Sequence, residues 1–264
     1  MTLTHPAYGK LRAVTPTAAV LLANNPGPMT LDGTNTWILR APGHTDCVVV
    51  DPGPDDPEHI AAIAEATGGA VALTLITHRH PDHTGGIDEL VRLTGSPVRA
   101  MEAEFLRGEV APLTGDEVID IAGLRITVLH TPGHTADSVS FLLADAVLSG
   151  DTILGRGTTV LDRDGTLRDY LRSMDRLLAE GAGRALLPAH GPDHPDLEPV
   201  ARYYIAHRHE RLEQVRAALD ELGADADAMD VVRKVYVDVD ESMWPMARNS
   251  VESQLTYLRS EADA

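Results

Sequence analysis

The residues best suited to chemistry lie in one short stretch, which reads His78-Arg79-His80-Pro81-Asp82-His83. Neutral imidazole nitrogens and carboxylate oxygens are good zinc ligands. Four such groups on one turn can point to two sides of it, so that one pair binds one metal ion and the other pair binds a second. Neither pair completes a coordination sphere, so other parts of the chain must supply further ligands. Chance histidines in a polar loop rarely reach this density, and the stretch therefore predicts a metal site.

Three later positions repeat the setting of this cluster. His134, Asp151 and His190 each follow a short apolar segment. Each is also flanked by Gly or Pro, which let the backbone turn tightly near a bound ion. Taken singly, each could be an ordinary loop residue. Taken with the first cluster, they indicate a shared set of ligands.

The cluster lies between a predicted strand and a predicted helix. Residues 71–76 form an apolar run typical of a short buried strand, and residues 87–93 follow as a helix. The ligands thus come at the carboxyl end of a strand, where open α/β sheets bind their ligands. Further strands are predicted over residues 11–14, 18–22, 36–39, 46–50, 98–100, 117–121, 124–129, 138–143, 146–148 and 185–187, and further helices over 56–67 and 167–180.

Composition narrows the class of protein. With 264 residues and 43% hydrophobic residues, the chain can form one sizeable domain with a small appendage. It contains no apolar run of about 18 residues and no apolar signal core at its start, so neither a membrane span nor export is expected. Its single cysteine, Cys47, excludes an internal disulfide, and a cytoplasmic location is predicted. The net charge of −18 opposes nucleic-acid binding at long range, although bound metal ions can offset it locally.

The complete set of candidate ligands resembles the metallo-β-lactamase superfamily. The H-x-H-x-D-H motif stands at residues 78–83, and the later motifs read Pro132-Gly133-His134, Ser149-Gly150-Asp151 and Pro188-Ala189-His190-Gly191. The resemblance covers about residues 10–195. It implies an α/β fold, the αβ/βα four-layer sandwich, in which two mixed sheets pack together with helices outside. It also implies that one metal is bound by His78, His80 and His134, the other by Asp82, His83 and His190, and both by Asp151.

These seven ligands leave each metal an open position for a bridging hydroxide. Two metal ions can lower the pKa of that water and stabilise a developing oxyanion, so no serine or cysteine nucleophile is required. Asp82 is the expected catalytic residue, because it could take the proton of the nucleophile and pass it to the leaving group. We expect two Zn²⁺ as cofactors, while Mn²⁺ or Fe²⁺ also suits mixed nitrogen and oxygen ligands. Asp51 matches a non-ligand aspartate of the superfamily, and we expect a structural role for it.

Segments outside the ligand set resemble the β-lactamase-like-protein-2 group, which includes a mitochondrial single-strand endoribonuclease. They are residues 25–36, residues 155–160, and the tail residues His207, Arg208 and Arg211. This resemblance favours hydrolysis of phosphodiesters in single-stranded RNA. We assign substrate contacts to Asn35, Arg156, Thr158, Thr159 and Arg208. Antibiotic hydrolysis is disfavoured, because true zinc β-lactamases usually lack the bridging aspartate and are exported.

Two other functions stay open. The first is a thioesterase similar to glyoxalase II, acting on a small-thiol or acyl-carrier thioester. The acidic surface favours it, but the tail lacks a clear equivalent of the basic residues with which glyoxalase II relatives bind glutathione. The second is a binding module without catalysis, in which a winged helix stands beside a structural metal. Open coordination argues against this, because structural zinc sites are closed.

The last part of the chain is predicted to form a separate unit. We expect a catalytic domain over residues 1–195 and a small, mainly helical, winged-helix-like domain over residues 196–264. The charged, periodic pattern predicts helices over 195–222, 226–235 and 248–258, with a short strand between them. The tail arginines could touch a polyanion, but interleaved acidic residues favour solvated charges, and the tail then shapes the mouth of the site or a homodimer contact. These arginines are Arg202, Arg208, Arg211 and Arg216.

Overall fold

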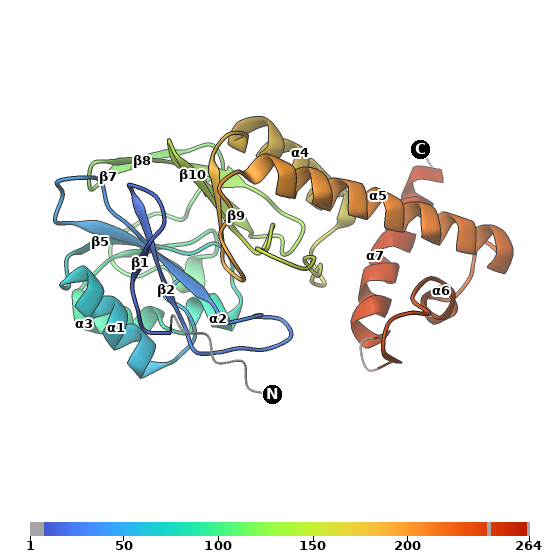
Figure 1. The fold of residues 1–264 in the computed structure, drawn as a ribbon, viewed down its shortest axis with the longest axis horizontal. Coiled ribbons are helices and arrows are strands. Elements are labelled where there is room, and N and C mark those ends of the chain that lie inside the picture. Colours follow the sequence, from blue (N-terminus) through green and yellow to red (C-terminus); the bar gives the residue numbers. More distant parts are fainter. Residues whose placement is uncertain (1–7, 242–243, 263–264) are drawn as a thin grey trace.

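The central strands of the protein are buried on both faces, which requires that each sheet be covered on two sides. The computed structural model describes residues 8–241 and 244–262 and contains two mixed sheets (Figure 1). The first sheet has the order β1 (Arg12–Ala13), β2 (Ala18–Leu22), β3 (Asn35–Leu39), β4 (Cys47–Val50), β5 (Val71–Leu75) and β6 (Val98–Arg99). The second has the order β11 (Ala185–Pro188), β10 (Ala146–Gly150), β9 (Val139–Leu142), β8 (Leu124–His130) and β7 (Val118–Ile121).

Three apolar clusters hold these layers together. One fills the space between the sheets and includes Trp37 from β3 and Phe141 from β9. A second packs α1 (Pro57–Thr67) and α3 (Ile87–Thr94) on the outer face of the first sheet. The third packs α4 (Leu167–Gly181) and α5 (Leu197–Leu222) on the second sheet. The predicted four-layer αβ/βα arrangement is therefore confirmed.

Local signals explain why the helices begin where they do. The side chain of Asp56 accepts hydrogen bonds from the amides of Glu58 and His59 and caps α1, and Pro57 occupies its first turn. Thr166 caps α4 and Asp196 caps α5 in the same way. Two short elements were not predicted, namely the single turn α2 (Pro81–Thr84) and the 3₁₀ turn η1 (Ala103–Phe105).

The tail is helical and shares a core with the second sheet. Helix α5 extends away from the sheets and carries α6 (Ala228–Val235) and α7 (Trp244–Ala262) at its far end (Figure 1). One apolar cluster continues from β10 through α4 and α5 to Val231 and Val251. Helix α7 begins four residues earlier than predicted, with Pro245 in its first turn, where a missing N–H costs nothing. The short strand expected in the tail is not found among its described residues.

Among the described residues, no helix combines the length and the apolar character that crossing a membrane requires.

Candidate metal centre

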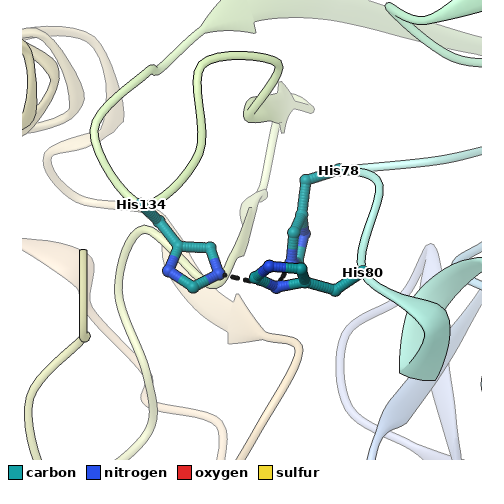
Figure 2. A group of neighbouring side chains, drawn as sticks. All are labelled: His78, His80 and His134. Carbon is teal, nitrogen blue, oxygen red and sulfur yellow. Dashed lines mark hydrogen bonds between the residues drawn. The ribbon is translucent and has the colours of Figure 1, made fainter. Parts of the chain in front are cut away.

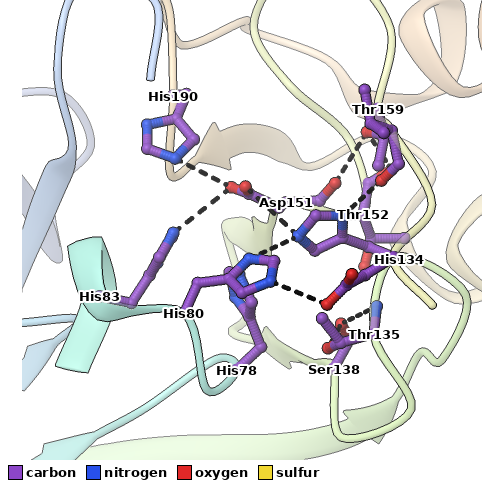
Figure 3. Close-up of polar contacts among 12 residues, drawn as sticks. His78, His80, His83, His134, Thr135, Ser138, Asp151, Thr152, Thr159 and His190 are labelled. Atoms are coloured by element: carbon purple, nitrogen blue, oxygen red, sulfur yellow. Dashed lines mark hydrogen bonds and ion pairs between the residues drawn. The ribbon is translucent and has the colours of Figure 1, made fainter. Parts of the chain in front are cut away.

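Every predicted ligand follows the carboxyl end of a strand. His78 and His80 lie in the loop after β5, and Asp82 and His83 stand on the single turn α2. The loops after β8, β10 and β11 carry the remaining three, His134, Asp151 and His190. Because these strand ends lie at one edge of the sandwich, all seven side chains come together in one place. Figure 3 shows six of them, all but Asp82.

Three imidazoles form the first group (Figure 2). The Nδ1 atom of His80 lies 3.0 Å from Nε2 of His78 and 3.1 Å from Nε2 of His134. His78 and His134 are buried, with 1% and 4% of their surface exposed. Three ring nitrogens therefore converge on one point.

The second group combines imidazole and carboxylate. The Oδ2 atom of Asp82 lies 3.1 Å from Nε2 of His190 and 3.4 Å from Nε2 of His83. Asp151 lies between the two groups, with Oδ1 at 3.4 Å from Nε2 of His190 and Oδ2 at 3.7 Å from Nε2 of His134. One carboxylate oxygen of Asp151 thus faces each group, as a bridging ligand requires.

The opposite ring nitrogen of all five histidines is held by an outer partner. A carbonyl or carboxylate oxygen accepts only, and the Thr77 hydroxyl already donates its hydrogen to Asp51. In each case the N–H of the ring therefore points to the partner, and the lone pair of the other nitrogen points into the centre. The partners are the Thr77 hydroxyl for His78 at 3.1 Å, Asp162 for His80 at 3.2 Å, Asp51 for His83 at 2.9 Å, the Val160 carbonyl for His134 at 2.6 Å and the Gly33 carbonyl for His190 at 3.1 Å.

The inward-facing atoms fit metal ions. Nε2 of His83, Oδ1 of Asp151 and Nε2 of His190 are buried and make no hydrogen bond. Leaving such atoms unpartnered costs about 1–3 kcal/mol each, so a native fold is expected to satisfy them. A set of five imidazoles and two carboxylates, with each imidazole fixed in orientation, suits two divalent ions such as zinc.

The electrostatics of the second group favour positive charge. Burial lowers the pKa of His83, but Asp51, Asp82 and Asp151 outweigh it and raise that pKa well above its ordinary value. Burial likewise opposes the carboxylates at His190, yet Asp151 and Asp82 raise its pKa to about 9. In the first group, burial lowers the pKa of His78 and His134. The carboxylates therefore stabilise positive charge at the second group, and a divalent ion would supply that charge.

Asp51 supports this centre from outside. Its side chain is 1% exposed and accepts hydrogen bonds from the amide of Thr77 at 2.8 Å and from the Thr77 hydroxyl at 2.7 Å. It also accepts the Nδ1–H of His83. These contacts agree with the structural role expected for it.

A second supporting network was missed by the sequence analysis. The guanidinium of Arg79, between the two first histidines of the motif, donates to Asp137 at 3.1 Å, to Asp162 at 2.7 Å and to Asp164 at 2.7 Å. It thereby fixes the segment after Val160 against the metal loop. Only Asp162 among these three also contacts His80.

This geometry predicts that Asp162→Ala weakens metal binding. Loss of the partner of His80 frees its ring, and removal of such an outer partner typically lowers metal affinity about 10- to 100-fold. Competition with a chromophoric chelator would measure the change. Asp164→Ala is the matched control, because Asp164 contacts Arg79 but not His80. Equal metal affinity in the two variants would contradict the role of Asp162.

A cleft of about 340 Å³ opens from the metal centre toward the tail. His134 and Asp151 line it, as do four of the five predicted substrate contacts, namely Arg156, Thr158, Thr159 and Arg208. The hydroxyl of Thr159 donates to the carbonyl of Asp151 at 2.7 Å. Arg156 is paired with Asp32.

The fifth predicted substrate contact, Asn35, lies outside the lining of the cleft. Its amide donates to the carbonyls of Pro188 at 3.0 Å and Gly191 at 2.9 Å. These bonds hold the turn that carries His190. Asn35 thus positions a candidate ligand and has its donors already in use.

The four tail arginines divide into two pairs. Arg208 and Arg211 line the cleft. Arg202 and Arg216 are exposed and form ion pairs one turn away, with Glu198 at 2.8 Å and Glu213 at 2.6 Å. The second pair therefore has the solvated setting that the interleaved charges suggest, and the first pair does not.

Comparison with known proteins gives consistent results. Residues 29–190 match the family model described as Metallo-beta-lactamase superfamily, and residues 228–262 match the Beta-lactamase associated winged helix domain. The chain is 32% identical to the Beta-lactamase-like protein 2 homolog of Drosophila melanogaster, covering 91% of this chain and 87% of that protein. It is 33% identical to Atrochrysone carboxyl ACP thioesterase of Aspergillus chevalieri, covering 82% and 70%. A metallo-beta-lactamase family protein of Thermus thermophilus has the same fold, with a TM-score of 0.76, 24% identity and 95% of each chain covered.

Proposed function

Since the chain belongs to the metallo-β-lactamase superfamily and is a metal-dependent hydrolase, we propose that it binds two Zn²⁺ and hydrolyses thioesters. In this proposal His78, His80 and His134 hold one ion, and Asp82, His83 and His190 hold the other. Asp151, whose two oxygens face the two groups, would be a ligand of both. When bound, the two ions would activate water at neutral pH and polarise the carbonyl that is attacked.

The residues of the chain have defined tasks in this reaction. Water adds to the thioester carbonyl carbon, and the C–S bond breaks to release a carboxylic acid and a thiol. Asp82 accepts a proton from the water and returns it to the sulfur that leaves. Its side chain is 26% exposed, whereas that of Asp151, which lines the cleft, is 11% exposed, so Asp82 is the more solvent-accessible carboxylate of the centre.

The apolar lining of the cleft is the observation that favours a thioester. Its walls include the apolar side chains Met29, Leu31, Val160, Val239 and Met246. An apolar wall next to a hydrolytic centre suits an acyl chain. The cations at the cleft do not continue along α5 as a track, because Arg202 and Arg216 are paired with carboxylates. An RNA chain needs contacts to several successive phosphates, which this acidic protein offers poorly.

Hydrolysis of single-stranded RNA is the second candidate. It is supported by the 32% identity to the Beta-lactamase-like protein 2 homolog, which covers 91% of this chain, and by the sequence features that resemble the endoribonuclease-like group. Arg208 and Arg211 would then face one phosphodiester near the metal centre.

An assay of both substrates by the zinc-loaded protein tests the proposal. We expect release of free thiol from acyl-coenzyme A, followed with a thiol reagent, and loss of that activity after treatment with a chelator. A fluorescent single-stranded RNA is offered in parallel, with Asp82→Asn as the control for a contaminating nuclease. Cleavage of RNA alone, abolished in Asp82→Asn, would replace the thioesterase proposal by the second candidate.

A further inference from the structure

Arg208 is a buried cation at the wall of the cleft. It is 5% exposed, one of its Nη atoms donates to the carbonyl of Thr159, and its guanidinium lies 4.8 Å from the centre of the Tyr170 ring. Its Nε is buried and makes no hydrogen bond. In the described parts of the chain, Arg208 forms no ion pair with a carboxylate. A buried charge is costly unless it is paired, so this arrangement calls for a partner from outside the chain.

Arg211 stands one turn further along α5 and lines the same cleft. Its guanidinium lies 4.7 Å from the centre of the Tyr236 ring, and Nη1 donates to Gln214 at 2.7 Å. Within residues 8–241 and 244–262 it too forms no ion pair. Two guanidinium groups thus face one small space, each oriented by an aromatic ring.

A purely structural role explains only part of this. The bond from Arg208 to Thr159 does attach α5 to the loop that follows β10. It accounts neither for the unpartnered Nε nor for the second guanidinium beside it. The buried Nδ1 of His207, on the same wall, also makes no hydrogen bond. This wall of the cleft therefore offers polar atoms that the described residues do not satisfy with hydrogen bonds.

We propose that Arg208 and Arg211 form a subsite that binds a carboxylate of the substrate, at the end of the acyl group far from the thioester. This inference rests on the proposed thioesterase function and specifies its substrates as thioesters of dicarboxylic acids. Planar guanidinium groups bind carboxylates through two parallel hydrogen bonds, and buried examples discriminate strongly against neutral ligands.

The location of the subsite favours the acyl group over the thiol as the bearer of the charge. The two arginines share one cleft with His134 and Asp151, where the thioester carbonyl must lie. The volume of about 340 Å³ leaves room for a short chain between them. Met29 and Val239 give that space an apolar wall. A phosphate at the far end of a long thiol arm would lie outside it.

The test compares two substrates that differ only in the end of the acyl chain. Glutaryl-coenzyme A ends in a carboxylate where valeryl-coenzyme A ends in a methyl group. We expect kcat/KM to be about 10²-fold higher for the glutaryl compound, as for other buried charge-assisted pairs. Equal kcat/KM values for the two would overturn the subsite while leaving the thioesterase function in place.

Variants of α5 assign the preference to its residues. Arg211→Met is expected to reduce the glutaryl-to-valeryl ratio by about tenfold or more, and Arg208→Lys to reduce it while keeping the buried charge. Arg202→Met is the matched control, because it lies on the same helix, is exposed and is expected to keep both the ratio and the activity. A ratio unchanged in both Arg211→Met and Arg208→Lys would exclude these arginines as the carboxylate ligands.

Two further measurements separate the alternatives. The same acyl pair on N-acetylcysteamine, a thiol without phosphate, should keep the preference. Its loss there, with both coenzyme A thioesters weakened equally by Arg211→Met, would place a phosphate of the thiol at the subsite and overturn the proposal. Calorimetric titration of the zinc-loaded protein with glutarate tests the subsite without turnover. Binding that is at least tenfold weaker in Arg211→Met than in Arg202→Met would support it even if no thioester is hydrolysed.

Discussion

Asp82→Asn is expected to lower kcat/KM by about 10²- to 10⁴-fold, the usual contribution of a positioned acid–base group. Asparagine keeps the size of the side chain and one oxygen. That oxygen can face Nε2 of His190, which lies 3.1 Å from Oδ2 of Asp82 in the wild-type protein. It cannot accept a proton at neutral pH. Burial opposes ionisation of Asp82, but His83 and His190 hold its pKa well below the ordinary range, so the side chain is a carboxylate at neutral pH, the form that a base and a metal ligand both require. Steady-state turnover and the number of metal ions per chain would both be measured.

The metal content decides between two reasons for the loss. If Asp82→Asn keeps two ions per chain and turnover still falls, the carboxylate acts in proton transfer. If one ion is lost and excess zinc restores turnover, the carboxylate acts chiefly as a ligand. Asp88→Asn is a suitable control, since Asp88 is exposed on α3 and pairs with Arg107. Wild-type turnover in Asp82→Asn would remove Asp82 from the mechanism.

The residues that cluster at the candidate metal centre could be predicted because each lies next to its own signal in the sequence. A short apolar run predicts the strand, and a Gly or Pro beside the polar residue predicts the turn at its end. This local pattern identified His134, Asp151 and His190, although none of them is near the others in sequence. The same reasoning predicted the strands and the start of α1, since Asp56 and Pro57 act within one turn, whereas the arrangement of the strands in two sheets was implied by the family resemblance.

The outer partners of the ligands could not be predicted in this way. Two of them are backbone carbonyls, at Gly33 and Val160, and every residue has a carbonyl. Asp162 lies 82 residues from His80 and has no distinguishing neighbours. Asn35 was assigned to the substrate from the resemblance of residues 25–36, and its hydrogen bonds to the carbonyls of Pro188 and Gly191, more than 150 residues away, left no trace in that segment. Long-range packing decides these contacts, and a local pattern does not contain it.

The tail arginines illustrate the same limit. Arg202 and Arg208 have similar charged neighbours in the sequence, yet one is exposed and the other is buried in the cleft. The helical period places the two arginines on different faces of α5. The packing of α4 and α7 against α5 decides which of these faces lines the cleft at the candidate metal centre. The local pattern thus predicts the helix, and the packing decides which of its cations can meet a substrate.

Asp51→Ala is expected to destabilise the protein by about 3–5 kcal/mol, the usual cost of removing one partner from a buried charged network. The change leaves the amide of Thr77 and the Nδ1–H of His83 without their acceptor inside the protein. It also places alanine at a φ of 53°, which aspartate and asparagine tolerate better. Denaturant unfolding in the presence of a chelator would measure the loss apart from any effect of metal. Asp46→Ala, at an exposed position just before β4, is the control and is expected to change stability little.

Asp51→Asn separates the charge of Asp51 from its shape. Asparagine keeps one oxygen for the amide of Thr77 and turns an NH₂ group toward the Thr77 hydroxyl and His83, where both neighbours were donors. His83 must then change its tautomer or its orientation, and its Nε2 lone pair no longer points steadily at the metal position. We therefore expect stability to fall less than in the alanine variant, while metal affinity at the second group falls about 10- to 100-fold. Wild-type metal affinity in Asp51→Asn would show that packing alone orients His83, and that the carboxylate serves only the fold.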